Sequence, residues 1–161
     1  MPNPADPIVE IIELDTRLFR NCLSGTDDEM IRRRITENTN SLHFLGCHLV
    51  DARFFLLRMI GEEAASPFPE LDSVRTIDEM PVPGPSLEEI LDAWNRVSPL
   101  LAERIRALTV EKLSSESPTR FPSVSATLLG GLTFLVQHES YHIGQMALVR
   151  KGLGFHAMSY S

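Results

Sequence analysis

The sequence predicts an all-α protein, a four-helix bundle with crossed connectivity. Four stretches carry apolar residues at the spacing of one helix face, and no stretch alternates apolar and polar residues as a strand would. Proline-rich segments separate these stretches and leave two long irregular connections. Adjacent antiparallel helices need only a few linking residues, so a long connection argues against simple up-down wiring.

The N-terminal part predicts one long helix and one short helical segment. Apolar residues recur at helical spacing over 8–22, with charged residues between them. An acidic residue and a proline precede this stretch, as at many helix starts. A short helical turn is expected over 27–35, with Thr26 as its cap.

The second long helix is expected over 40–60. One stripe of this helix contains the following residues: Ser41, Leu45, His48, Ala52, Phe55 and Met59. Gly61 stands where a left-handed residue commonly ends a helix. The segment 62–85 contains five prolines, which predicts a long connection that crosses the bundle or lines a functional mouth.

The third helix begins at a capping box formed by Ser86 and Glu89 and runs to about Leu108. Pro99 lies inside this helix and is expected to kink it. A second irregular connection follows over 109–124, with one helical turn at 110–113.

The fourth helix is expected to start after Ser123 or Ser125, either of which is a suitable cap, and to continue to Lys151. Gly152 and Gly154 then end the helix.

Length and charge narrow the possible functions. The chain of 161 residues is expected to form one domain over 1–161. Its net charge of −7 argues against nucleic-acid binding, which depends on basic side chains that neutralise phosphates. The chain shows no signal peptide and no membrane-spanning run, so we expect a cytoplasmic protein without a membrane partner. Cys22 and Cys47 are expected to be reduced thiols.

The residues His138-Glu-Ser-Tyr-His142 carry the main chemical signal. They match the pattern in which two histidines four apart on a helix bind zinc and the glutamate acts as a base. A helical projection also places His48 on the buried stripe of the second helix, so three histidines point inward. Three protein ligands and an open position are typical of a catalytic metal site. His43 is expected to be exposed on the opposite face, and His156 in the tail is an outside candidate ligand.

A metalloprotease is disfavoured by the residues that follow the motif. The longer protease pattern needs glycine and histidine where this chain has Gln145 and Leu148, and no acidic residue follows Glu139. Glu139 lies at the edge of the metal-facing stripe, where it could be a catalytic residue, a support for a ligand or a helix-interface residue. Tyr141 flanks the other edge as a hydrogen-bond donor or a packing residue.

Two stretches resemble the DinB-like (DinB/YfiT-type) superfamily of metalloenzymes. Residues 40–53, which contain His48, resemble the second helix of that family, and residues 138–150 resemble its last helix. The resemblance implies a four-helix bundle with crossed connectivity, a homodimer, and a divalent metal such as nickel or zinc. It also implies a histidine triad of ligands at His48, His138 and His142. This chain departs from the pattern at Cys47, where a small residue is usual.

Two kinds of function are open, and the family likeness supports the first of them. The first is a metal-dependent enzyme that acts on a small-molecule substrate, as a thiol S-transferase or isomerase that uses a low-molecular-weight thiol, or as a hydrolase. The second is a non-catalytic stress-related or binding module whose metal is structural or vestigial. The second is favoured by the lack of an evident further catalytic group beyond Glu139.

Overall fold

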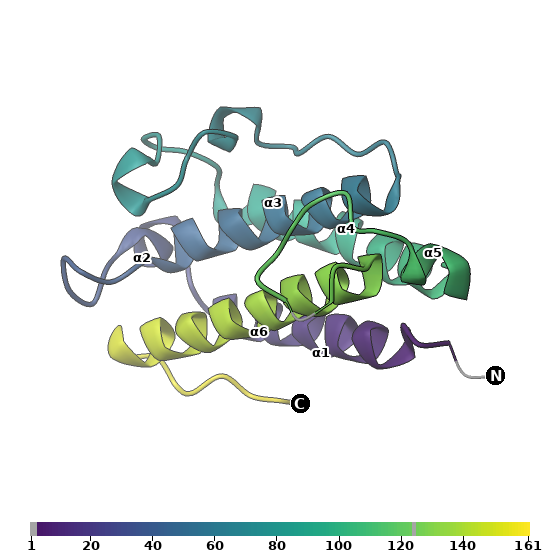
Figure 1. Ribbon diagram of the computed structural model, residues 1–161. Coiled ribbons are helices and arrows are strands. Elements are labelled where there is room, and N and C mark those ends of the chain that lie inside the picture. The colour runs from purple at the N-terminus through teal and green to yellow at the C-terminus, as the bar shows by residue number, and fades with distance from the viewer. Residues whose placement is uncertain (1–2, 124) are drawn as a thin grey trace.

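The computed structural model describes residues 3–123 and 125–161 (Figure 1). The elements in this part of the chain are all helical, apart from one bridge between Glu116 and Thr127, as predicted. The four long helices are α1 (Asp6–Leu23), α3 (Leu42–Ile60), α4 (Leu87–Arg106) and α6 (Leu128–Gly152). The short elements are α2 (Asp28–Arg32), η1 (Pro69–Leu71), η2 (Ile77–Glu79) and α5 (Val110–Ser114).

The long helices pack side by side along most of their length (Figure 1). The main contacts join α1 to α4 and α6, and join α3 to α4 and α6. The connection between α3 and α4, which contains η1 and η2, arches over one side of α3 (Figure 1). The segment before α6 lies against that helix, where the Phe121 and Phe134 rings stack with centroids 5.2 Å apart.

Several helix ends follow from local sequence. The Ser41 side chain caps α3, and Gly61 ends that helix with a φ of 103°, a left-handed conformation that glycine adopts readily. Ser86 and Glu89 form the predicted capping box at the start of α4. These three ends are set by residues within one helical turn. Sequence patterns identified Gly61 and the capping box, whereas Ser41 was expected inside the helix and proves to be its cap.

Two predicted caps are wrong. Asp27, and not Thr26, caps α2, because its carboxylate accepts a hydrogen bond from the Met30 amide at 2.8 Å. Thr127 caps α6 in place of Ser123 or Ser125. The predicted end of the second connection, residue 124, lies outside the described residues.

A distant contact sets the start of α6. The Leu128 amide donates to the Ser115 carbonyl at 2.8 Å, and Thr127 forms the bridge with Glu116. This tether holds Thr127 in an extended conformation, so α6 begins at the next residue, Leu128.

The apolar core consists of two clusters with a buried polar layer between them. In α1, residues up to Ile12 belong to one cluster, and residues from Leu18 onward belong to the other. The polar layer contains the following buried side chains: Asp15, Arg53, Ser98 and Glu139. A buried charge is costly unless it is paired, so the partners within this layer determine whether the fold tolerates it.

Arg53 is the centre of the polar layer. Its side chain is 0% exposed and forms a double hydrogen bond with Glu139, at 2.6 and 2.8 Å. The guanidinium also donates to the Thr16 hydroxyl at 2.7 Å and lies 3.6 Å from the centroid of the Trp94 ring. Arg53 thereby links α3 to α6, α1 and α4 at the level of the histidine motif.

Asp15 supplies a pH-dependent contribution to stability. Burial, and secondarily the Glu139 charge, raise the pKa of Asp15 to about 6, against the lowering effects of Ser140 and Arg53. A carboxyl with a raised folded-state pKa binds its proton more tightly in the folded state, so the charged form opposes folding at neutral pH.

We therefore expect Asp15→Asn to raise the free energy of unfolding at pH 7.5 by on the order of 1 kcal/mol. Asparagine can still accept the hydrogen bond that Ser140 donates to Asp15 at 2.6 Å. The gain should shrink as pH falls from 6 toward 4, where the wild-type carboxyl becomes neutral. Urea unfolding at pH 7.5 and pH 4.5 measures both values, and a gain that is equal at the two pH values would contradict this account.

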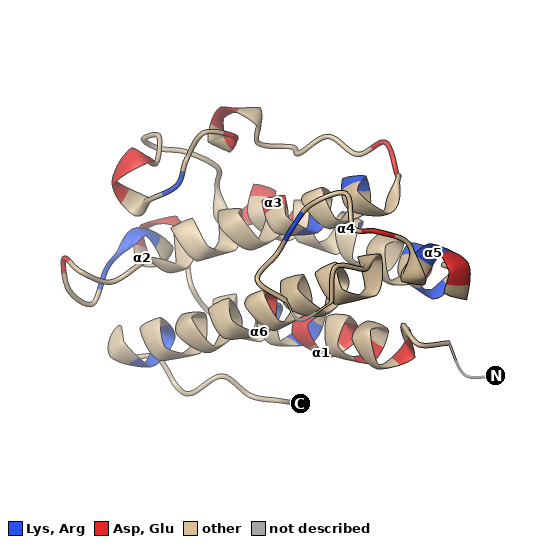
Figure 2. Cartoon of the chain, viewed as in Figure 1, with Lys and Arg blue, Asp and Glu red and all other residues tan. Residues whose placement is uncertain are grey.

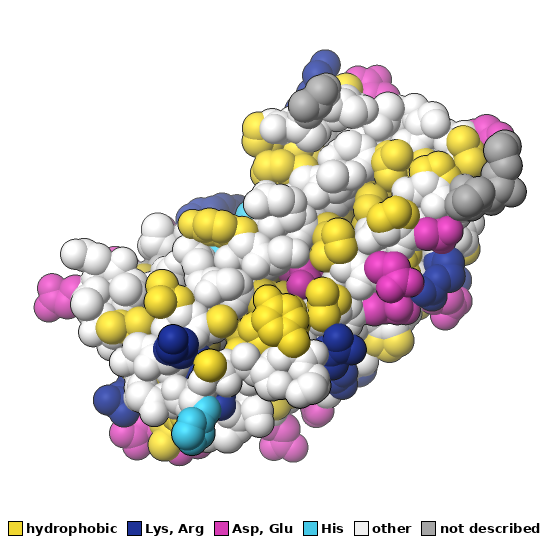
Figure 3. Space-filling model, turned by 90° about the horizontal axis from the view of Figure 1, so that it is seen from below, with side chains coloured by type: hydrophobic (Ala, Val, Ile, Leu, Met, Phe, Trp, Pro, Cys, Tyr) yellow, Lys and Arg dark blue, Asp and Glu magenta, His cyan; other side chains and the backbone are white. Residues whose placement is uncertain are grey.

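Charged residues are unevenly distributed over the surface. Figure 2 shows that α6 is largely uncharged, whereas acidic side chains recur on the α3–α4 connection and on α1. Figure 3 shows apolar side chains interspersed with charged ones on the face seen from below. Among the described residues, no helix has the length and apolar character needed to cross a membrane.

Candidate metal centre

Three histidines from two packed helices meet at one point. His138 and His142 lie one turn apart on α6 and therefore share a face. His48 reaches them from α3. The Nε2 atoms of His138 and His142 are 3.0 Å apart, and those of His48 and His138 are 3.4 Å apart. Ligand atoms of all three rings lie within 4.8 Å of one another, so the group could hold a metal ion.

The spacing of these nitrogens agrees with ligation of one ion. Imidazole nitrogens bind zinc at about 2.0–2.1 Å, so two such ligands on a tetrahedral ion lie ~3.3 Å apart. The ring planes are steeply inclined to one another, at 71°, 83° and 84°, so the rings meet edge to face. His48, His138 and His142 would hold such an ion, and a tetrahedral ion would keep a further position for a small molecule.

A hydrogen bond to Gln145 orients His142. The Nδ1 atom of His142 lies 2.7 Å from Oε1 of Gln145, which can only accept a hydrogen bond. Nδ1 therefore carries the proton and Nε2, which faces the other two rings, keeps its lone pair. The Gln145 amide nitrogen in turn donates to the Tyr141 hydroxyl at 3.2 Å. Tyr141 is 59% exposed, so it holds Gln145 from the solvent side.

The protonation of two rings also suits metal binding. Burial first, and then the neighbouring rings of His142 and His138, lower the pKa of His48 to about 4. Burial and the nearby His142 hold the pKa of His138 below its usual value. Because a metal binds the neutral imidazole, these two rings are in the ligating form at neutral pH. His138 Nδ1 is buried and has no hydrogen-bond partner among the described residues.

Glu139 lies in different surroundings from the histidines beside it. Its side chain is 2% exposed, and both carboxylate oxygens accept hydrogen bonds from Arg53. These contacts correspond to the helix-interface role that the sequence left open. A catalytic role for Glu139 stays a prediction, and the geometry gives it no support.

The remaining histidines and the two cysteines lie outside the group of three histidines. His43 was expected to be exposed, and this is wrong, because its side chain is buried and its Nε2 lies 2.7 Å from the Pro85 carbonyl oxygen. His156 is exposed in the tail and is not part of the histidine group. Cys22 and Cys47 are both free and buried, and burial raises the pKa of each thiol to about 12.

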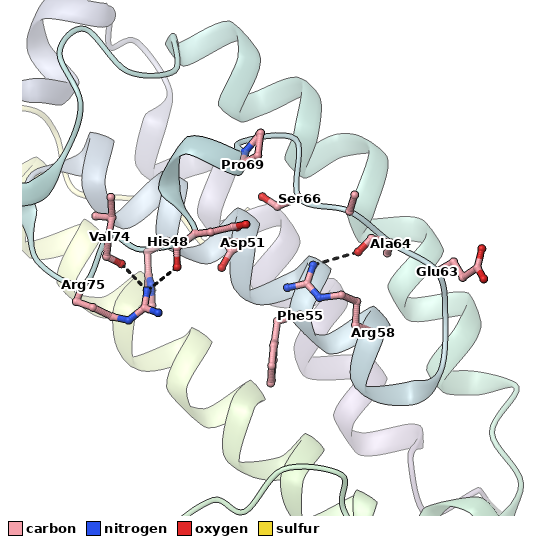
Figure 4. A pocket seen from close by; sticks show the side chains of 12 residues that line it. His48, Asp51, Phe55, Arg58, Glu63, Ala64, Ser66, Pro69, Val74 and Arg75 are labelled. Carbon is pink, nitrogen blue, oxygen red and sulfur yellow. Dashed lines mark hydrogen bonds between the residues drawn. The ribbon is translucent and has the colours of Figure 1, made fainter.

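Two cavities meet at the histidines. One, of about 510 Å³, is bordered by all three of them and by Arg34, Asn38 and Arg75. The other, of about 1070 Å³, lies between α3 and the segment 63–75, and His48 and Arg75 border it as well (Figure 4). A small molecule in the smaller cavity would therefore lie beside all three histidines, and one at the His48 end of the larger cavity would lie beside His48.

Sequence reasoning missed two groups that shape this region. Arg53 was treated as an ordinary helix residue, although an arginine in the middle of an apolar helix stripe is an indication of a buried ion pair. Asp51 lies one turn after His48 and borders the larger cavity, but it received no role. Gln145 follows His142 by three residues and so shares its face of α6, and its hydrogen bond to His142 explains why a polar residue is found there.

Comparison with known proteins places the chain in a family. Neither the curated proteins nor the solved structures gave a match. The family model of the DinB superfamily matches residues 11–146, a span that contains His48, His138 and His142. Because this match covers most of the chain and all three histidines, the protein belongs to the DinB superfamily.

Proposed function

We propose that His48, His138 and His142 bind one divalent metal ion, zinc or nickel, and that the protein is a metal-dependent enzyme acting on a small molecule. The observation that carries this proposal is that one ring nitrogen from each of the three histidines lies within 4.8 Å of the others, at a site that borders two cavities. When bound, such an ion lowers the pKa of a thiol or water and polarises a carbonyl. This chemistry supports a thiol S-transferase, an isomerase or a hydrolase, with a low-molecular-weight thiol as the second substrate of a transferase.

The chain's own residues hold and shield the site in this proposal. His48 and His138 stay neutral through burial, and Gln145 keeps the His142 proton on Nδ1. The ion pair between Arg53 and Glu139 fixes α3 against α6, so the ligands from the two helices keep their spacing. Glu139 is thus a positioning residue in this proposal.

Metal content of the purified protein tests the proposal. We expect about one divalent ion per chain in the wild type, and a loss of that ion in His48→Ala and in His142→Ala. His156→Ala is the matched control, because His156 is exposed and lies outside the histidine group. Elemental analysis by mass spectrometry measures all four proteins. Equal metal content in all four would exclude the proposed ligands.

Gln145 gives a finer test of the same centre. Gln145→Leu removes the acceptor that orients His142, so we expect metal affinity to fall by roughly 10–100-fold, the usual effect of losing such a partner. Gln145→Glu should keep the affinity, because its carboxylate accepts the same hydrogen bond. Gln137→Leu, at an exposed position of α6, is the control. Competition with a chromophoric chelator measures the affinities, and equal values for the two leucine variants would contradict this role.

The alternative is a binding or stress-related module with a structural or vestigial metal. The engagement of Glu139 by Arg53 favours it, because this removes the nearest acidic side chain of α6 from the site. A conjugation assay with small thiols and electrophiles separates the two proposals. Turnover that disappears on chelation and returns with added metal supports the enzyme, whereas no turnover with metal-loaded protein supports the module.

The proposal also includes an architecture and an assembly. We propose a single four-helix bundle with crossed connectivity, supported by the contacts of α1 and α3 with the same two helices, α4 and α6. The cytoplasmic location and the homodimer implied by the family likeness remain proposals. Light scattering coupled to gel filtration tests the homodimer directly.

A further inference from the structure

An unpaired carboxylate oxygen, on Asp51, borders the larger cavity, which His48 lines as well. Asp51 lies on α3 between His48 and Phe55, on the side of the helix that the segment 63–75 covers (Figure 4). Its Oδ1 atom is buried and has no hydrogen-bond partner among the described residues. A buried acceptor without a donor is costly, so such a group in a functional cavity indicates a missing donor.

The basic side chains of the cavity do not supply that donor. Arg58 donates to the Ala64 carbonyl at 3.0 Å, and Arg75 donates to the Asp72 and Val74 carbonyls at 2.8 and 3.0 Å. Asp51 takes part in none of the salt bridges formed by the described residues. Its charge is therefore available to a molecule that enters the cavity.

We propose that the larger cavity binds a small zwitterion whose anionic group ligates the metal and whose ammonium group pairs with Asp51. This inference rests on the proposed metal centre. An ion held by three neutral imidazoles attracts an anion, and the Asp51 carboxylate one turn away attracts a cation. A neutral hydroxyl would also fill the hydrogen bond of Oδ1, but it would leave the charge of Asp51 unpaired.

An aromatic side chain in the lining of the same cavity favours a ligand with a short apolar segment between its charged ends. Phe55 lines the cavity directly. Its ring meets Phe121 edge to face with centroids 6.4 Å apart, and Phe121 stacks on Phe134, which in turn lies 6.4 Å from the His138 ring. This row of ring contacts links Phe55, at the cavity, to His138, one of the proposed ligands.

Small hydroxamates on the cobalt-loaded protein test the inference without assuming a reaction. Acetohydroxamate supplies the metal-binding head alone, and aminoalkyl hydroxamates with one, two or three methylenes add an ammonium group. The change in visible absorption of cobalt on titration gives each dissociation constant. We expect at least one aminoalkyl hydroxamate to bind wild type about tenfold more tightly than acetohydroxamate. The reason is that the free energy of a hydrogen bond between charged groups corresponds to roughly a tenfold change in affinity.

Two variants assign the preference to Asp51. Asp51→Asn keeps the shape of the side chain and removes its charge, and it should bind all four hydroxamates with similar affinity. Asp92→Asn makes the same charge change at an exposed position of α4, outside both cavities, and should keep the preference.

The possible results separate this inference from the metal proposal. If wild type takes up no cobalt, the metal centre and the inference both fail. If cobalt binds but acetohydroxamate causes no spectral change, the inference fails and the metal centre stands. If all four hydroxamates bind wild type equally, the inference fails and the metal centre stands. The same holds if Asp51→Asn weakens all four to the same degree, because Asp51 would then support His48 instead of contacting the ligand.

Discussion

Arg53→Met is expected to destabilise the protein by roughly 3–5 kcal/mol, because it leaves the Glu139 carboxylate buried without its partner. The two side chains are 0% and 2% exposed, so water cannot replace the lost hydrogen bonds. The variant also loses the contacts of the guanidinium with the Thr16 hydroxyl and the Trp94 ring. Urea unfolding followed by circular dichroism, with a chelator present so that metal makes no contribution, measures the change.

Two further variants identify the cause. Arg58→Met changes an exposed arginine on the same helix, which donates only to the Ala64 carbonyl, and should alter stability by less than about 0.5 kcal/mol. The double variant Arg53→Met with Glu139→Gln removes both charges and should recover part of the loss, since neutral groups are cheaper to bury than one unpaired charge. If Arg53→Met and Arg58→Met have the same effect, the ion pair does not stabilise the fold.

Adding zinc to metal-free protein is expected to raise its melting temperature substantially. A ligand at one hundred times its dissociation constant stabilises the folded state by about 2.7 kcal/mol, because it binds the folded chain and not the unfolded one. For a domain of this length, that energy corresponds to a rise of roughly 5–10 °C. Thermal unfolding with and without zinc measures the rise, and its removal by a chelator should be reversible.

The histidine variants show whether this rise comes from the proposed centre. His142→Ala leaves two of the three rings, so zinc should raise its melting temperature little or not at all. His156→Ala should respond like wild type, because the tail histidine lies outside the group. A normal rise in His142→Ala would mean that zinc stabilises the protein from another site.

The helices themselves could be predicted from sequence because their signals are local. The apolar spacing that predicted the second long helix lies within the helix itself, and Gly61 directly follows the end that it determines. The same reasoning explains the capping box of α4. Prediction from local sequence failed at the start of α6. That start depends on a hydrogen bond to Ser115, which lies before the loop that leads to α6.

The candidate metal site was predicted in part for the same reason. Two histidines four residues apart must share a face of a helix, so His138 and His142 needed no tertiary information. His48 was placed on an apolar stripe, and α3 packs against α6 so that this stripe meets the pair. A helical projection cannot account for His43, since the Pro85 carbonyl that covers it comes from the far end of the long connection.

The sequence by itself therefore determined the helical class, the long helices and a pair of histidines suited to one metal ion, because each depends on the period of a single helix. Only the tertiary structure decided that His48 completes the group, that Arg53 binds Glu139, and that Asp51 lacks a partner beside a cavity. Those relations join residues on different helices, or a helix and a distant loop. They follow from how the helices pack, which the spacing of residues along one helix does not reveal.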